Sequence, residues 1–268
     1  MSAVEIGLAL FGAMLALMAL RVPIAISMFI PGAVGYALLA SSAALLNHLK
    51  GAAWARLSLY DLSVIPLFLL MGQFATQGGL SRALFRFANS LVGHRRGGIA
   101  MAAVLACAAF GTVCGSSVAT AATVTQVALP EMRQHRYSGR LSTATLSAGG
   151  TLGILIPPSV VLVVYAILTE QNIAKLFVAA MVPGILAAIG YVVAIALYVR
   201  LVPGHAPDVP RVSARERRAA ALEVWPIAAI FTVVFGGIYG GVFTPTEGAA
   251  VGAAGTFVAA LSKRVLSL

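Results

Sequence analysis

The chain is a succession of long apolar blocks separated by short polar loops. Most blocks approach the roughly 20 residues that a membrane-spanning helix needs. The eight blocks have the approximate limits 4–20, 24–46, 62–78, 98–129, 141–168, 176–201, 224–242 and 248–261. Stretches such as 181–199 are continuously apolar instead of alternating, which favours helices over the strands of a transmembrane barrel. The pattern therefore predicts an all-α, polytopic integral membrane protein.

Composition excludes several other classes of protein. The chain is 60% hydrophobic and 10% charged, which disfavours a soluble protein. The net charge of +10 raises the possibility of nucleic-acid binding, but the basic residues stand at block ends, where membrane topology explains them, and we expect no nucleic-acid partner. Cys107 and Cys114 lie in one apolar block and imply no disulfide. The first block lacks a basic leader and an obvious cleavage site, so it is interpreted as the first span.

The block 98–129 has an unusual length. Its roughly 32 residues are too many for one ordinary crossing and too few for two. Arg95 and Arg96 precede it, Arg133 and Arg136 follow it, and the positive-inside rule places both ends in the cytoplasm. This predicts a re-entrant helical hairpin with its tip near Gly115. The alternative is one long, tilted or kinked crossing, which would place the two basic loops on opposite faces of the membrane.

The remaining loops fit the same topology. The N-terminus and 171–175 are then outside, and the cytoplasmic groups are Arg21, the loop 211–218, Lys263 and Arg264. Lys50 and Arg56 are exceptions, in a stretch that could lie along the membrane interface.

Small and hydroxyl-bearing residues gather at the expected hairpin tip. Lipid tolerates an opened backbone only where protein or a polar cavity covers it. Glycine permits the turn, and hydroxyl groups can satisfy freed backbone groups or coordinate an ion. The residues concerned are Gly111, Gly115, Ser116, Ser117 and Thr120. Small residues also permit close helix packing, so the tip alone does not establish a site.

A second interruption lies in the block 141–168. Pro157 and Pro158 should break this helix, because Pro158 lacks an amide hydrogen and Pro157 is disfavoured in the α region by the proline after it. Gly149, Gly150 and Thr151 precede the break, which frees carbonyl oxygens on the upstream turn. Two broken elements at similar depth are typical of secondary transporters that bind coupling ions and carboxylates. Carbonyl and hydroxyl oxygens can coordinate sodium, a hard cation, without a buried carboxylate. Sodium is therefore a better prediction for the coupling ion than a proton.

Ionisable residues are nearly absent from the middle of the blocks. The acidic residues at block ends are Asp61, Glu131, Glu170, Glu223 and Glu247. The four histidines lie in separate loops, and Ser116 has no visible base, so neither a metal centre nor an intramembrane enzyme is expected. Between the last two blocks, Thr244 or Thr246 is expected to cap a helix that has Glu247 in its first turn.

Four motifs together resemble a known family. "GSSVATAATV", "LPEM", "AGGTLGILIPPSVVLVVYAILTEQNIAKLF" and "YGGVFTPTE" follow one another in this order. With them the chain resembles the large membrane subunit of tripartite ATP-independent periplasmic (TRAP) transporters, the DctM-like family, over essentially its whole length. The resemblance implies an elevator-type, sodium-driven importer in the bacterial inner membrane. Its partners would be a small four-helix membrane subunit and a periplasmic binding protein that delivers a C4-dicarboxylate, sialic acid or a similar organic acid.

The resemblance also implies roles for individual residues. The sodium site would comprise Gly115, Ser116, Ser117, Gly149, Gly150, Thr151 and Pro157. The substrate carboxylate would approach Ser116, Ser117, Thr120 and Pro158. By the same likeness, 1–97 would be scaffold helices, 98–168 half of a transport domain with the hairpin (98–129) and a discontinuous helix (141–168), and 169–268 the following helix, a basic loop and connecting helices.

Members of that family carry a second, inverted repeat with its own hairpin. The chain corresponds to roughly the first three-fifths, so a fragment, a split gene product or a truncated gene is expected. The alternative to a transporter subunit is therefore a non-transporting membrane scaffold that still binds the small subunit.

Overall fold

The computed structural model describes residues 3–207 and 209–262, and this part of the chain forms helices and no strand. The all-α prediction is thereby confirmed. The chain divides into two compact units, Met1–Leu59 and Tyr60–Leu268, which are described separately.

The first unit contains three helices, α1 (Ala3–Ala19), α2 (Ile24–Leu39) and α3 (Ser42–Leu57). α1 and α2 pack against each other, and a methyl group on Gly35 would lie 2.6 Å from Leu10 Cδ1. The predicted block 24–46 is wrong as a single element, because the chain leaves helical geometry at Ala40 and Ser41. The hydroxyl group of Ser41 then accepts a hydrogen bond from the Ala44 N–H and stabilises the first turn of α3. Lys50 and Arg56 both lie on α3.

The second unit begins with a bent helix pair. The 3₁₀ turn η1 (Tyr60–Ser63) leads into α4 (Val64–Gln77), and after Gly78 and Gly79 the chain continues as α5 (Leu80–Val92) at 67°. Gly79 has a φ of 74°, a left-handed conformation that glycine adopts readily. The block 62–78 is too short to cross a membrane as one helix, because α4 has 14 residues and could span a membrane only together with α5.

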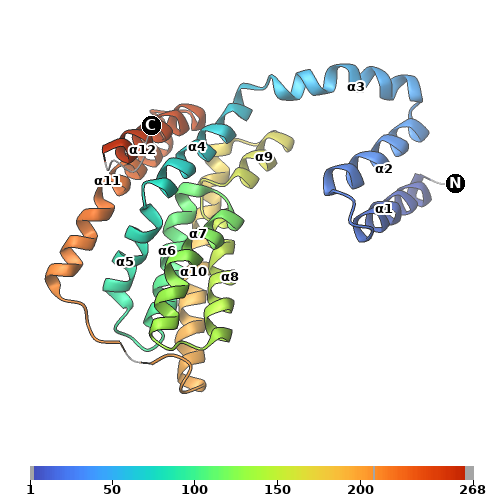
Figure 1. The fold of residues 1–268 in the computed structure, drawn as a ribbon. Coiled ribbons are helices and arrows are strands. Elements are labelled where there is room, and N and C mark those ends of the chain that lie inside the picture. Colours follow the sequence, from blue (N-terminus) through green and yellow to red (C-terminus); the bar gives the residue numbers. More distant parts are fainter. Residues whose placement is uncertain (1–2, 208, 263–268) are drawn as a thin grey trace. The chain divides into compact units, whose positions relative to one another are not determined.

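Seven more helices complete the second unit. They are α6 (Gly98–Cys114), α7 (Ser117–Gln134), α8 (Gly139–Leu155), α9 (Val160–Leu168), α10 (Ile173–Leu201), α11 (Ala214–Tyr239) and α12 (Pro245–Ser262). α6, α7, α8 and α10 form a bundle, and α12 packs against α4 and α11 (Figure 1). Most side chains of α6 are buried, so this apolar helix forms the centre of the unit. α10 and α11 are each long and apolar enough to cross a membrane.

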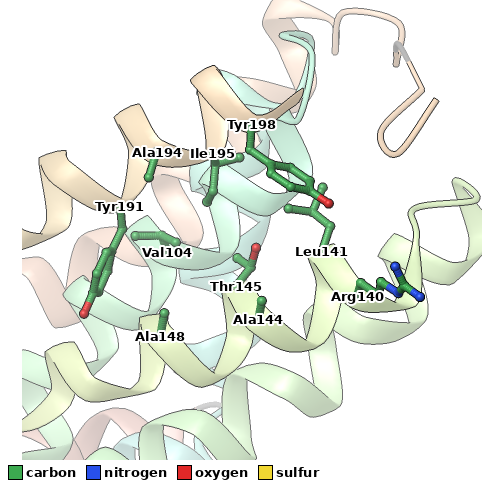
Figure 2. A pocket seen from close by; sticks show the side chains of 10 residues that line it. All are labelled: Val104, Arg140, Leu141, Ala144, Thr145, Ala148, Tyr191, Ala194, Ile195 and Tyr198. Atoms are coloured by element: carbon green, nitrogen blue, oxygen red, sulfur yellow. The ribbon is translucent and has the colours of Figure 1, made fainter. Parts of the chain in front are cut away.

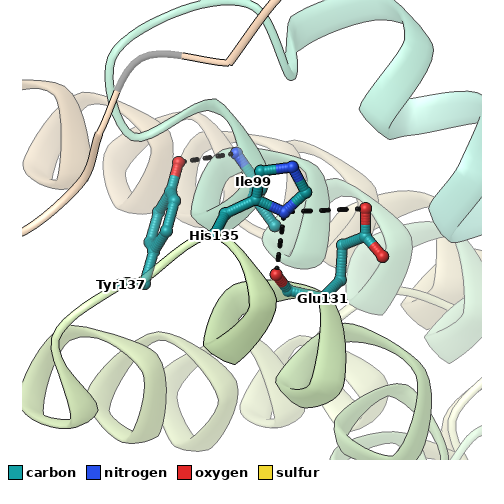
Figure 3. A network of polar contacts seen from close by, with 4 residues as sticks. All are labelled: Ile99, Glu131, His135 and Tyr137. Carbon is teal, nitrogen blue, oxygen red and sulfur yellow. Dashed lines mark hydrogen bonds and ion pairs between the residues drawn. The ribbon is translucent and has the colours of Figure 1, made fainter.

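The basic loops of the second unit meet at one end of the bundle. The hydroxyl group of Tyr137, after α7, accepts a hydrogen bond from the Ile99 N–H at the start of α6, at 3.3 Å (Figure 3). The Ser138 N–H donates to the carbonyl oxygen of His205, beyond α10, at 3.0 Å. A methyl group on Gly97 would lie 3.0 Å from Val199 Cγ2 near the end of α10. The two ends of the segment 98–134 therefore lie together. A hairpin requires this arrangement, whereas the two ends of a single crossing would lie far apart.

Side-chain caps fix where the last two helices begin. Ser213 and Glu216 form a reciprocal capping box at the start of α11. At the start of α12, the N–H and hydroxyl groups of Thr244 donate to Glu247 Oε2 at 2.8 and 2.9 Å, and these bonds lower the pKa of the Glu247 carboxyl group. Thr244, and not Thr246, is the cap. Lys263 and Arg264 lie outside the described residues.

Candidate functional site

The tip of the hairpin is a two-residue turn between α6 and α7. Gly115 ends α6 with a φ of 64°, and its N–H donates to the Gly111 carbonyl oxygen at 2.8 Å. Ser116 is extended, and its hydroxyl group accepts a hydrogen bond from the Ala119 N–H at 3.4 Å. This combination of a left-handed glycine and a serine cap ends one helix and starts the next within two residues. The predicted tip near Gly115 is confirmed.

The break between α8 and α9 lies at the proline pair. α8 ends at Leu155, Ile156 is extended, and α9 begins at Val160 after a bend of 41°. Pro157 and Pro158 have no N–H, so the carbonyl oxygens of Gly153 and Ile154 lose the donors that a continuous helix would supply. The predicted interruption at Pro157 and Pro158 is confirmed.

The tip and the break are in direct backbone contact. The Val160 N–H donates to the Gly115 carbonyl oxygen at 3.5 Å, and a methyl group on Gly115 would lie 3.0 Å from the Pro158 carbonyl oxygen. A methyl group on Gly153 would lie 2.5 Å from the Thr120 hydroxyl oxygen and 2.7 Å from the Ser116 carbonyl oxygen. Glycines therefore let the two interrupted elements approach without intervening side chains.

Four helix ends converge at this contact. The C-termini of α6 and α8 bring partial negative charge from their last carbonyl groups, and the N-termini of α7 and α9 bring partial positive charge from their first N–H groups. Ser116 and the fully buried Ser159 cap these two N-termini through their hydroxyl oxygens. The arrangement can therefore attract a cation to the carbonyl groups and an anion to the N–H groups at one place.

Thr120 contributes a buried hydroxyl group to the same contact. Its side chain is inaccessible to solvent, and its hydroxyl group contacts the Cys114 thiol, a weak hydrogen-bonding group. A buried hydroxyl oxygen whose partner is a thiol keeps lone pairs that an ion could use.

The structure brings together most of the residues predicted from the sequence. Gly115, Ser116, Thr120 and Pro158 belong to the contact itself. Gly150 of α8 faces α7, where a methyl group on it would lie 2.6 Å from Ala121 Cβ and 3.3 Å from the Ser117 carbonyl oxygen.

Two predicted residues face other helices. A methyl group on Gly149 would lie 3.1 Å from Cys107 Sγ on α6. The Thr151 hydroxyl group lies 2.7 Å from the Ala148 carbonyl oxygen and 3.1 Å from the Tyr191 hydroxyl group on α10. Thr151 is thus turned away from the hairpin tip, and its part in an ion site stays a prediction.

Sequence reasoning missed two residues of the contact. Gly153 and Ser159 are not among the predicted site residues, although a serine after a proline pair is a signal for a helix cap. Among the described residues no three His, Cys, Asp or Glu side chains gather as a metal-binding group, and Cys107 and Cys114 are free thiols.

Comparison with known proteins gives a consistent result. The family model described as "Tripartite ATP-independent periplasmic transporter, DctM component" matches residues 11–268. Three similar proteins are each named "C4-dicarboxylate TRAP transporter large permease protein DctM". The Pseudomonas aeruginosa protein is 47% identical over 72% of this chain and 45% of its own length. The Vibrio cholerae protein is 38% identical over 92% and 54%, and the Rhodobacter capsulatus protein 35% identical over 93% and 59%. The chain thus spans about half the length of these relatives, all of which are permeases and none an enzyme.

Proposed function

This chain belongs to the DctM component family of tripartite ATP-independent periplasmic transporters, and we propose on this basis that it forms part of a large permease subunit for sodium-coupled import of an organic acid. The observation that carries the proposal is the backbone contact between the hairpin tip at Gly115 and the proline break before Val160.

The sodium ion would bind at the C-terminal ends of α6 and α8. Sodium is a hard cation that prefers oxygen ligands, and this end of the contact offers carbonyl oxygens that Pro157 and Pro158 leave without donors. The hydroxyl groups of Ser116, Ser117 and Thr120 are the side-chain oxygens nearest in sequence to the tip. No carboxylate is needed in such a site, which agrees with the absence of acidic residues from the hairpin tip.

The substrate carboxylate would approach the N-termini of α7 and α9. Their first N–H groups and helix dipoles favour an anion, and the neighbouring cation would strengthen the attraction. A C4-dicarboxylate is the first choice because the similar proteins carry that substrate in their names. The substrate would reach the permease from a periplasmic binding protein, and a small membrane subunit would support the helices of the scaffold.

The proposed orientation places the basic end of the second unit in the cytoplasm of a bacterial cell, with the N-terminus in the periplasm. The loops beside Arg95, Arg133 and Arg140 lie at that end, in accordance with the positive-inside rule. In the elevator mechanism that we propose, the hairpin and the broken helix would move together relative to the remaining helices.

Sodium binding can be tested on the purified chain by thermal unfolding. Replacing choline chloride by sodium chloride should raise the unfolding temperature, because a ligand that binds only the folded state stabilises it by about 1.4 kcal/mol at roughly ten times its Kd. In the double variant Ser116→Ala, Ser117→Ala we expect most of this sodium-dependent rise to disappear. Ser147→Ala, on an exposed position of α8, is the matched control and should keep the full rise.

An equal rise in the double variant and in the control would contradict the sodium site. Transport itself requires proteoliposomes that contain the chain, the small subunit and the binding protein loaded with radiolabelled succinate. Sodium-dependent uptake would support the transporter, and association with the small subunit without uptake would support the scaffold alternative instead.

A further inference from the structure

A groove of about 410 Å³ runs between α8 and α10, apart from the hairpin tip. Its volume falls within the roughly 300–1,000 Å³ of ligand pockets in proteins. Val104 of α6 forms part of its floor, and Tyr191 and Tyr198 of α10 line it at two levels, about two helical turns apart (Figure 2). Most of the lining is apolar, so the groove suits a ligand with a hydrocarbon part.

Polar groups are distributed unevenly along this groove. Arg140, in the first turn of α8, lies at the end where the basic loops gather, and Tyr198 lies near it with its hydroxyl group 2.8 Å from His205 Nδ1 (Figure 2). Further along, alanines of both helices and Ile195 line the groove. The groove thus changes from cationic and polar at one end to apolar toward the middle of the bundle, as a phospholipid of the adjacent leaflet changes from headgroup to acyl chain.

The side chain of Thr145 has a buried hydroxyl group in the wall of the groove. It is 4% exposed, it lines the groove, and its hydroxyl group has no hydrogen-bond partner among the described residues (Figure 2). A hydroxyl group buried without a partner is unfavourable, so an acceptor supplied by a ligand would stabilise it. Thr145 lies five residues beyond Arg140, about 7.5 Å further along the helix axis and about 140° around it.

Arg140 lacks a partner that would explain its position. No carboxylate pairs with it in the part of the chain that the structure describes. A cation in the first turn of a helix also interacts unfavourably with the helix dipole, whereas an anion there interacts favourably. Basic pockets between transmembrane helices on the cytoplasmic side are a recognised way of binding anionic lipid headgroups.

We propose that the groove between α8 and α10 binds one anionic phospholipid. Its phosphate group would contact Arg140, and one acyl chain would lie against Tyr198, Ile195 and Tyr191. The Thr145 hydroxyl group, which has no accessible surface in the structure, would turn into the groove and donate a hydrogen bond to a glycerol ester carbonyl oxygen. The lipid would fill the space between the broken helix α8 and the long helix α10, against α6 and apart from the hairpin tip. The inference does not depend on sodium coupling or on the identity of the transported acid.

Native mass spectrometry of the purified full chain can test this proposal. The chain is titrated with phosphatidylglycerol, phosphatidylcholine or inorganic phosphate. We expect one phosphatidylglycerol per chain, bound about tenfold more tightly than phosphatidylcholine, and no competition by inorganic phosphate, because the apolar groove contributes to affinity. Arg140→Gln should weaken phosphatidylglycerol binding about tenfold, as expected for loss of a charge-assisted hydrogen bond.

Two further variants distinguish the contribution of the Thr145 hydroxyl group to lipid binding from the contribution of the groove's shape. Thr145→Val keeps the shape of the side chain and should weaken binding of both lipids about threefold to tenfold, as expected for one neutral hydrogen bond. Ala194→Trp fills the groove from an exposed position of α10 and should abolish the bound lipid even if Thr145→Val does not fold. The matched controls Arg133→Gln and Thr143→Val change exposed residues of the same region outside the groove and should bind as the parent chain does.

Three outcomes would overturn the proposal. The first is phosphatidylglycerol binding that is unchanged in both Arg140→Gln and Ala194→Trp. The second is displacement of the lipid by inorganic phosphate, which would make the site one for a soluble anion. The third is a dimer without lipid that Ala194→Trp disrupts, which would make the groove an interface with a second copy of the chain.

Discussion

Gly153 lies where no side chain fits. A methyl group there would lie 2.5 Å from the Thr120 hydroxyl oxygen and 2.7 Å from the Ser116 carbonyl oxygen, and the backbone of the hairpin tip has little room to move. Gly153→Ala should therefore destabilise the chain by about 1–3 kcal/mol through overpacking, which outweighs the gain of up to about 1 kcal/mol in helix propensity. Thermal or urea unfolding of the purified chain, followed by circular dichroism, measures this difference.

Gly190 supplies the matched control. It lies inside α10, and no atom comes within 4 Å of a methyl group built on it, so Gly190→Ala should leave stability unchanged or raise it slightly. Equal effects of the two substitutions would show that close packing at the tip does not limit the residue at 153.

At the scale of residues, the sequence predicts where a turn or a break lies along the chain better than it predicts which neighbouring helix a side chain faces. Gly115 was identifiable because a turn between two apolar helices at that depth needs a left-handed residue. Thr151 shows the limit. Its hydroxyl group lies beside Tyr191, and which side of α8 faces α10 depends on packing between segments 40 residues apart, which no local pattern contains.

At the scale of helices, the proline pair interrupts an apolar segment that would otherwise continue as one helix. Pro130 and Pro183 lie inside the continuous helices α7 and α10, whereas Pro157 and Pro158 separate α8 from α9. Two adjacent prolines remove two donors, and the second also disfavours helical geometry in the first. In the double variant Pro157→Ala, Pro158→Ala we expect α8 and α9 to join, so that the contact between Val160 and Gly115 is lost.

Amide hydrogen exchange at the tip measures this change. Protection of the N–H groups in 115–120 and 159–163 should fall by at least about tenfold in the double variant, because the tip would lose its covering segment. Pro183→Ala is the control, since it restores a donor within a helix that is already continuous. Unchanged protection in the double variant would mean that the tip is ordered without the break.

The same scale shows why some helices were missed. The hairpin was predictable because basic loops at both ends constrain an apolar segment of known length. α5 was not recognised, because Arg82 and Arg86 on its exposed side lower its hydropathy, although Leu80, Ala83, Phe85 and Ala88 form its buried side. The separation of α2 from α3 was missed because neither glycine nor proline marks it, only a serine cap.

For the whole molecule, the decisive question is which loops share a side of the membrane. The hydrogen bonds from Ile99 to Tyr137 and from Ser138 to His205 bring three loops to one end of the second unit. The same end carries the arginines of these loops, whereas the α9–α10 turn at Gln171 lies at the opposite end of α10 from His205 (Figure 1). Charge and contacts are therefore both consistent with the proposed topology, in which the hairpin enters the membrane and returns.

Labelling from the two sides of the membrane tests this topology directly. Single cysteines replace Arg95, Arg133 or Gln171 in a chain whose buried Cys107 and Cys114 are changed to alanine. With a membrane-impermeant maleimide we expect Arg95→Cys and Arg133→Cys to react in inverted vesicles and Gln171→Cys in right-side-out vesicles. The segment between Arg95 and Arg133 contains the whole hairpin. Reaction of these two positions from opposite sides of the membrane would therefore show that this segment is a single crossing. The backbone contact at Gly115 could then no longer serve as a site reached by a re-entrant tip.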